Sequence, residues 1–200
     1  MNPKITFKYS RIYDEHWKEL GKFYGVKDVK YPSESEIRSY IKKAEKEWRK
    51  SEGKILTELS RITGLKWKEK TISCYVVGRC IPISDPLTLK VYDKRERFID
   101  VLTHELIHQL MASQEGNLKK AKKAWDHLYK EYKNESFTTV VHVPVHALHK
   151  HVLLKFFGEK RLKDEVESLI MFPDYKRAWD IVEKEGYLNI IKKFTDKIKK

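Results

Sequence analysis

The chain has 200 residues, of which 40% are hydrophobic and 36% are charged. This length and apolar content suit one domain with a buried core, and they exclude a short disulfide-stapled chain or a low-complexity one. The formal net charge is +13, but lysines alternate with acidic residues along most of the sequence, so we expect ion-paired, solvated helix faces rather than one gathered nucleic-acid-binding face.

The N-terminal part of the sequence predicts a short strand followed by helices. Residues 5–9 alternate like a strand, and residues 14–24 predict a helix that ends before Gly25. Ser33 and Glu36 then have the spacing of a capping box, in which each side chain bonds the backbone of the other residue. A long amphipathic helix is therefore expected to begin directly after Ser33.

This helix is expected to run to about Ser51, where Gly53 interrupts the pattern, and Gly64 ends a second helical stretch. β-branched runs bounded by turn residues come next and predict two or three strands. We expect these strands at residues 71–77, 81–83 and 87–92.

The segment that follows the strands carries the chemistry. Residues 98–111 place apolar side chains at helical intervals, and within them stand His104, Glu105 and His108. Histidines four residues apart project from one helix face and can share a metal ion, while Glu105 lies about 100° round the axis, beside the open position of the ion. The pattern predicts a hydrolytic metal centre.

Helical patterns fill the rest of the chain, at residues 118–133, 136–157 and 160–198, the last broken at Pro173 and Gly186. We therefore predict an α+β fold that is mainly helical, with a small, mostly antiparallel sheet before the motif helix. The expected organisation is a single domain over residues 1–200. Its expected parts are a helical N-terminal segment at 1–70, a catalytic core at 71–157 and C-terminal helices at 158–200.

The motif from Val101 to Leu110 resembles that of the zincin metallopeptidases, whose members carry HExxH on a helix preceded by strands. The metzincin branch is excluded because Met111 and Gln114 stand where that branch has glycine and a third histidine. The resemblance implies a gluzincin-like minimal scaffold, in which a second helix supplies the third zinc ligand. It also implies that the edge strand, here between Cys80 and Tyr92, binds an extended substrate.

In the gluzincin-like pattern the second helix offers a ligand and, four residues later, a partner that orients a first-helix histidine. His142 and His146 have this spacing, with histidine at both positions. We expect His142 to be the ligand and His146 to be the orienting residue or a reserve ligand. Glu131 is the rival, because it has the ligand type of the family. Pro144 requires that this helix either begins near Val141 or is kinked.

The implied mechanism is hydrolysis of a peptide bond by a zinc-bound water, with Glu105 as general base. His149 is the candidate oxyanion donor, with Tyr129 and Tyr132 as alternatives. Asp100, one turn before His104, is a candidate to orient that imidazole, although an ordinary surface acid fits the position too.

A peptide or protein is the expected substrate. The alternatives are a nucleic-acid-associated protein of the SprT-like kind, for which support is weak, and a zinc-stabilised protein without activity. The sequence shows neither a signal-peptide pattern nor a membrane-spanning run, so we expect a cytoplasmic protein without membrane contact. Its wealth of lysine and glutamate is typical of thermophiles. Cys74 and Cys80 are expected to be buried thiols, a zinc-masking thiolate being the alternative.

Overall fold

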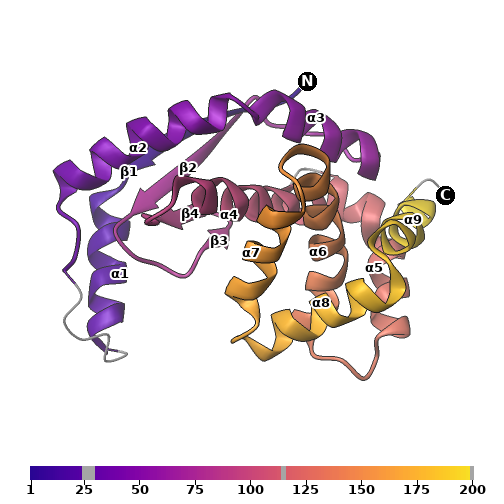
Figure 1. The fold of residues 1–200 in the computed structure, drawn as a ribbon. Helices are drawn as coiled ribbons and strands as arrows, with labels where there is room; N and C mark the ends of the chain where they lie inside the picture. The colour runs from indigo at the N-terminus through magenta and orange to yellow at the C-terminus, as the bar shows by residue number, and fades with distance from the viewer. Residues whose placement is uncertain (24–29, 114–115, 199–200) are drawn as a thin grey trace. The chain divides into compact units, whose positions relative to one another are not determined.

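A computed structural model describes residues 1–23, 30–113 and 116–198 (Figure 1). Contacts divide the chain into two compact units, residues 1–54 with 69–106 and residues 55–68 with 107–200. In chain order the elements are β1 (Lys4–Tyr9), α1 (Arg11–Phe23), α2 (Glu34–Arg49), α3 (Glu52–Thr63), β2 (Thr71–Val77), β3 (Ile83–Ser84), β4 (Leu87–Lys90), α4 (Arg95–His108), the π-helical turn η1 (Gln109–Ser113), α5 (Asn117–Glu131), α6 (Phe137–Phe156), α7 (Glu159–Leu169), α8 (Pro173–Glu185) and α9 (Tyr187–Ile198).

The predicted α+β class is confirmed, because helices dominate and the strands form one small sheet. Within the described residues, no helix has both the length and the apolar character required to cross a bilayer. The boundaries of the predicted 71–157 core and its flanking segments stay a prediction, since each compact unit combines two separate stretches of sequence.

The sheet has the strand order β1-β2-β4-β3, in which β1, β2 and β4 are parallel and the two-residue β3 is antiparallel to β4. The prediction of a mostly antiparallel sheet was therefore wrong. Short strands close together in sequence suggested hairpins. Instead, β1 pairs with β2 across a helical connection, and β4 returns to pair with β2 in the parallel sense.

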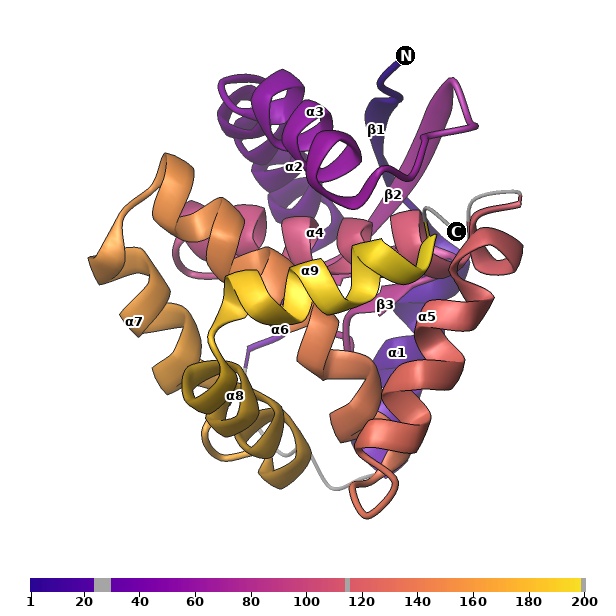
Figure 2. The ribbon, with the colours of Figure 1, turned by 90° about the vertical axis from the view of Figure 1, so that its right-hand side faces the viewer.

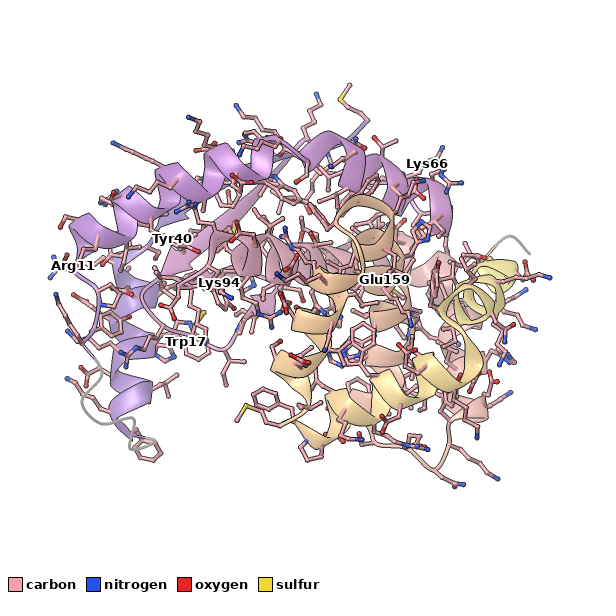
Figure 3. All side chains as sticks on the ribbon, in the orientation of Figure 1. Arg11, Trp17, Tyr40, Lys66, Lys94 and Glu159 are labelled. Atoms are coloured by element: carbon pink, nitrogen blue, oxygen red, sulfur yellow. The ribbon has the colours of Figure 1, made fainter. Side chains whose placement is uncertain are left out.

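One face of the sheet packs against helices of the first unit. Ile5 pairs with Ile72 and Phe7 with Cys74, so these apolar side chains share a face. The ring of Phe98 on α4 lies 5.8 Å from that of Phe7 between ring centroids. Tyr40 of α2, labelled in Figure 3, brings its ring centroid within 5.7 Å of Phe98. The sheet thus supports the first half of α4.

The turn after β2 is fixed by a buried carboxylate on α1. Asp14 accepts hydrogen bonds from the hydroxyl of Tyr31 at 2.5 Å and from the backbone nitrogen of Gly78 at 2.7 Å. Glycine lets the ring of Tyr31 come close at this turn, because a Cβ on Gly78 would lie 2.5 Å from that ring and would displace it. The start of the connection to β3 is thereby held against α1.

Several predicted helix ends agree with the structure and others do not. The Ser33 and Glu36 capping box is present, as predicted. However, α2 ends at Arg49 and α3 begins at Glu52, so Gly53 lies inside α3 and does not interrupt a helix. A single glycine costs a helix only about 1 kcal/mol, which neighbouring packing offsets. The predicted stop at Gly25 lies outside the described residues.

The second unit is a group of helices around α6, which contacts α7, α8 and α9. Figure 2 shows α9 lying across α6 and beside α5. The predicted breaks at Pro173 and Gly186 are confirmed, since Pro173 opens α8 and Gly186 follows its last residue. In contrast, α6 begins at Phe137, so Pro144 lies inside the helix and a start near Val141 is wrong.

An ionic cluster around the buried carboxylate of Glu58 joins α3 to α6 within this unit. The carboxylate of Glu58 contacts Arg61 at 2.6 Å, His151 at 2.7 Å and Lys155 at 2.9 Å. The hydrogen bond from Arg61 is the main reason that the pKa of Glu58 lies well below its ordinary value, despite opposing desolvation. Folding therefore favours the ionised carboxylate, and this contribution exists above the unfolded-state pKa of about 4.3 and is lost as the pH falls below it.

We expect Glu58→Gln to lower the free energy of unfolding at pH 7 by about 1–3 kcal/mol, because Arg61, Lys155 and His151 lose the buried carboxylate that they contact. Urea denaturation at pH 7 and at pH 3.5 should show a smaller difference from the wild type at the lower pH. Glu167→Gln is the control, because Glu167 is exposed and should change stability by less than about 0.5 kcal/mol. An equal destabilisation at both pH values would contradict the assigned role of the charge.

Candidate metal centre

His104 and His108 stand one turn apart on α4. His104 is 7% exposed and His108 is half-buried. The two compact units divide between Leu106 and Ile107, inside this helix, so the backbone of α4 itself fixes the two imidazoles relative to each other. The predicted helix and the predicted alignment of the histidines are both present.

His142 on α6 completes a group of three. One nitrogen atom each from His104, His108 and His142 lies within 4.8 Å of the others, so the group can hold a metal ion. The ring centroids of His108 and His142 are 4.9 Å apart and the rings are nearly perpendicular, at 72°. Within residues 1–23, 30–113 and 116–198, the three histidines form the one group of three or more histidine, cysteine or acidic side chains that could hold a metal ion.

The backbone of α6 sets the orientation of His142. Its Nδ1 lies 2.7 Å from the carbonyl oxygen of Thr138. Because a carbonyl oxygen only accepts, Nδ1 carries the proton and donates it, which leaves the lone pair on Nε2. This is the common arrangement for a metal-binding imidazole, whose second nitrogen is held by a hydrogen bond. The donor chemistry of the group therefore fits a divalent metal ion.

Desolvation favours the neutral form of His108 and His142. Desolvation is the main cause that lowers the pKa of His108 to about 3, and the nearby His142 adds to it. Desolvation also lowers the pKa of His142, with the Thr138 carbonyl partly opposing it. A metal needs the neutral form of each ligand, so neither ring would have to release a proton near pH 7.

Glu105 follows His104 in the helix and is 8% exposed. Burial raises its pKa to about 8. A cation bound at the neighbouring histidines would favour the charged carboxylate and so oppose this desolvation. A buried carboxylate with a raised pKa beside a possible metal position is typical of a residue that exchanges protons with a substrate or water.

The two cysteines belong to the same unit as Glu105, and both are free thiols. Cys74 is fully buried, as predicted, whereas Cys80 is only partly buried. Burial raises the pKa of Cys80 to about 12, with Glu105 adding to the rise and Lys90 opposing it. The pKa of Cys74 is also raised, so neither residue supplies a thiolate near pH 7.

His146 and His149 lie deeper along α6 than His142. His146 has no exposed surface and stacks on Trp179, with ring centroids 4.4 Å apart and 13° between the planes. His149 is also fully buried, and its Nδ1 lies 3.8 Å from the carboxylate of Glu165 on α7. Neither belongs to the group of three, and the role of His149 as oxyanion donor stays a prediction.

Glu131 and Asp100 both lie outside the group of three. Glu131 is paired with Lys193 at 2.6 Å and with His127 at 3.5 Å, and it is absent from the group of three. Asp100 is buried on α4, one turn before His104, and is thus no surface acid.

The two tyrosines weighed as oxyanion donors have other contacts. Tyr129 stacks on Phe137, with ring centroids 6.0 Å apart. The hydroxyl of Tyr132 donates to Glu185 at 3.0 Å. Both side chains are therefore engaged with neighbours outside the group of three histidines.

Tyr175 on α8 is a site residue that sequence reasoning missed. Its ring centroid lies 4.2 Å from that of His142, and the side chain is half-buried. Tyr175, Ala178, Trp179 and Val182 form a helical stripe in the sequence, which indicates an inward face. The stripe does not indicate which helix α8 packs against, so only the packing of α8 on α6 reveals the contact between Tyr175 and His142.

The helix that carries the motif changes form directly after His108, where the five residues of η1 make a π-helical turn. The widened turn is supported by Asn117, whose side-chain amide donates to the carbonyl oxygens of Leu110 at 2.7 Å and Lys66 at 3.0 Å. π-helical turns are rare in proteins overall, but those that do occur are often found at functional sites.

Comparison of the chain with protein-family models, curated proteins and solved structures finds no match. The arrangement of its residues is therefore what indicates a function for this chain.

Proposed function

We propose that this protein is a zinc-dependent metallopeptidase of the zincin type, with His104, His108 and His142 as the metal ligands and Glu105 as the general base. The observation that carries the proposal is the meeting of three imidazole nitrogens within 4.8 Å, with a buried carboxylate on the residue after the first of them. Three protein ligands with room for a fourth is the usual composition of a catalytic zinc site.

Zinc is the metal that this donor set favours for hydrolysis, because imidazole nitrogens suit it and it brings no redox chemistry. When bound, it supplies a Lewis acid that makes water acidic near neutral pH and stabilises negative charge on oxygen. The three neutral imidazoles leave the full charge of the ion available for this purpose, whereas a carboxylate ligand would cancel part of it.

Glu105 performs the proton transfers. Its carboxylate accepts a proton from the water whose oxygen attacks the carbonyl carbon of the substrate. It then gives this proton to the departing amine nitrogen as the carbon–nitrogen bond breaks. The position of Glu105 supports this role, because its side chain is buried from bulk water and it is the residue next to the proposed ligand His104.

Tyr175 takes the place of His149 as the candidate donor to the developing oxyanion. Its phenol ring packs against the ligand His142 and the side chain is partly open to solvent, whereas His149 is fully buried. A hydroxyl donor near a developing negative charge lowers the barrier by electrostatic stabilisation.

Metal analysis followed by cleavage profiling tests the proposal. We expect the purified protein to retain about one equivalent of zinc. We expect it to cut a diverse peptide mixture, as detected by mass spectrometry, to stop when the zinc is removed by a chelator, and to recover when zinc is added back. Zinc binding with a chelator-sensitive melting temperature and no cleavage would instead indicate a silent, metal-stabilised protein. Salt-sensitive binding to DNA would favour the nucleic-acid-associated alternative.

A further inference from the structure

The turn between α7 and α8 exposes three consecutive large apolar side chains. Ile170, Met171 and Phe172 have relative exposures of 51%, 77% and 49%, and we call them the α7–α8 patch. A run of this kind is costly in water and promotes aggregation, so it is usually found where a surface has a binding role. The proposed catalytic residues do not account for it.

Hydrogen bonds join the start of α8, directly after the patch, to the start of α6. The hydroxyl of Ser136 donates to the carboxylate of Asp174 at 2.7 Å, and the hydroxyl of Thr139 donates to the backbone carbonyl of Asp174 at 3.2 Å. Thr138, between these two residues, supplies the carbonyl that orients His142. One turn of helix therefore positions both a metal ligand and the start of α8.

A chain of aromatic contacts leads from the patch to the candidate metal centre. The ring centroid of Phe172 lies 5.9 Å from that of Tyr175, and the ring of Tyr175 lies 4.2 Å from that of His142. The patch is thus continuous with the site through one intervening side chain. A peptide substrate whose backbone reaches the histidines would therefore place the side chain of a nearby residue at the patch.

The charges beside the patch favour an uncharged occupant. Lys176 on α8 is paired with Asp180 at 2.8 Å, and Arg177 is paired with Glu135 at 2.6 Å. Both cations are thus largely neutralised by nearby carboxylates, so they add little attraction for a phosphate backbone or for an acidic peptide. What the turn offers to a partner is mainly its apolar area.

We propose that the α7–α8 patch binds a bulky apolar side chain of an extended peptide substrate close to the bond that is cleaved. The proposal rests on the proposed function and deepens it, because it names the substrate class. Burying even part of one such side chain against Met171 and Phe172 is worth about a factor of ten in binding, which is enough to select among peptides.

The test compares two labelled peptides that differ only in having phenylalanine or serine at one position. Binding is measured by fluorescence anisotropy with excess chelator present, so that cleavage plays no part. We expect the double variant Met171→Ser with Phe172→Ser to bind the phenylalanine peptide about tenfold more weakly than the wild type and the serine peptide within about twofold. Leu188→Ser is the matched control, because Leu188 is 57% exposed on α9, and it should change neither value.

The same variants and peptides are then compared in kcat/KM for the zinc-loaded protein, where the preference for phenylalanine should fall by the same factor. Unchanged preference in both measurements would overturn the patch assignment and leave the peptidase standing. Selective binding that depends on the patch, without cleavage of any peptide, would keep the assignment and reject the peptidase alone. A wild type that is dimeric while the double variant is monomeric would show that a second copy of the chain covers the patch, which also overturns the proposal.

Discussion

Glu105→Gln should abolish peptide hydrolysis while leaving the metal in place. The amide cannot accept a proton from water, so we expect kcat to fall by about 10²–10⁴-fold, the usual contribution of a general base. The side chain keeps its size and stays in the buried stretch of α4. The zinc content of the purified variant, measured by elemental mass spectrometry, should stay at the wild-type level.

The matched control for this variant is Glu96→Gln, because Glu96 is an exposed residue in the first turn of the same helix. It makes the same chemical change away from the histidines, and its kcat should equal that of the wild type. If Glu105→Gln cleaves peptides at the wild-type rate, Glu105 is no general base and the mechanism is rejected. If Glu105→Gln loses its metal as well, the loss of activity reflects damage to the metal site. The kcat of a second variant, Glu105→Asp, then separates loss of the base from loss of the metal.

His142→Ala should remove the third ligand and weaken zinc binding more than about 100-fold. Loss of a residue that only orients a metal ligand already weakens metal binding by about 10–100-fold, so loss of a ligand itself should weaken it more. Competition with a chromophoric chelator gives the zinc affinity directly, independently of any peptidase activity. The fall in affinity should bring a parallel loss of hydrolysis at limiting zinc.

Two other histidines serve as comparisons in this experiment. His16→Ala changes an exposed histidine on α1 and should leave the affinity unchanged. His146→Ala removes the ring that stacks on Trp179 and should affect stability more than affinity, because His146 lies outside the group of three. Zinc affinity that is lost in His146→Ala and kept in His142→Ala would reverse the assignment of the third ligand.

The motif on α4 was readable from the sequence because all of its constraints are local. A helix places residues four apart on one face whatever the rest of the chain does, so the alignment of His104 and His108 follows from spacing and apolar periodicity alone. The capping box at Ser33 is of the same kind, since its two hydrogen bonds join residues three apart. Strand β2 was likewise predicted over its observed residues, 71–77.

The sequence could rank His142 above Glu131 as a candidate ligand, but only packing brings His142 into the group of three histidines. Both residues lie beyond the motif helix, and ligand type favours neither strongly enough. The position of Glu131 at the end of α5, where Lys193 of α9 neutralises it, depends on how α5 and α9 pack. The orientation of His142 depends on a carbonyl of its own helix, which α6 supplies because it begins at Phe137 and runs through Pro144.

The sequence by itself determined the helical character of the chain, the two-histidine and glutamate motif and the existence of a second histidine-bearing helix, because each depends on contacts within a few residues. Only the tertiary structure decided the parallel pairing of β1, β2 and β4, the burial of His149, and the contact of Tyr175 with His142. These features depend on which apolar faces meet, and many pairings of such faces bury similar area. Periodicity shows that a face is buried, whereas the shapes and connections of all the elements together select its partner.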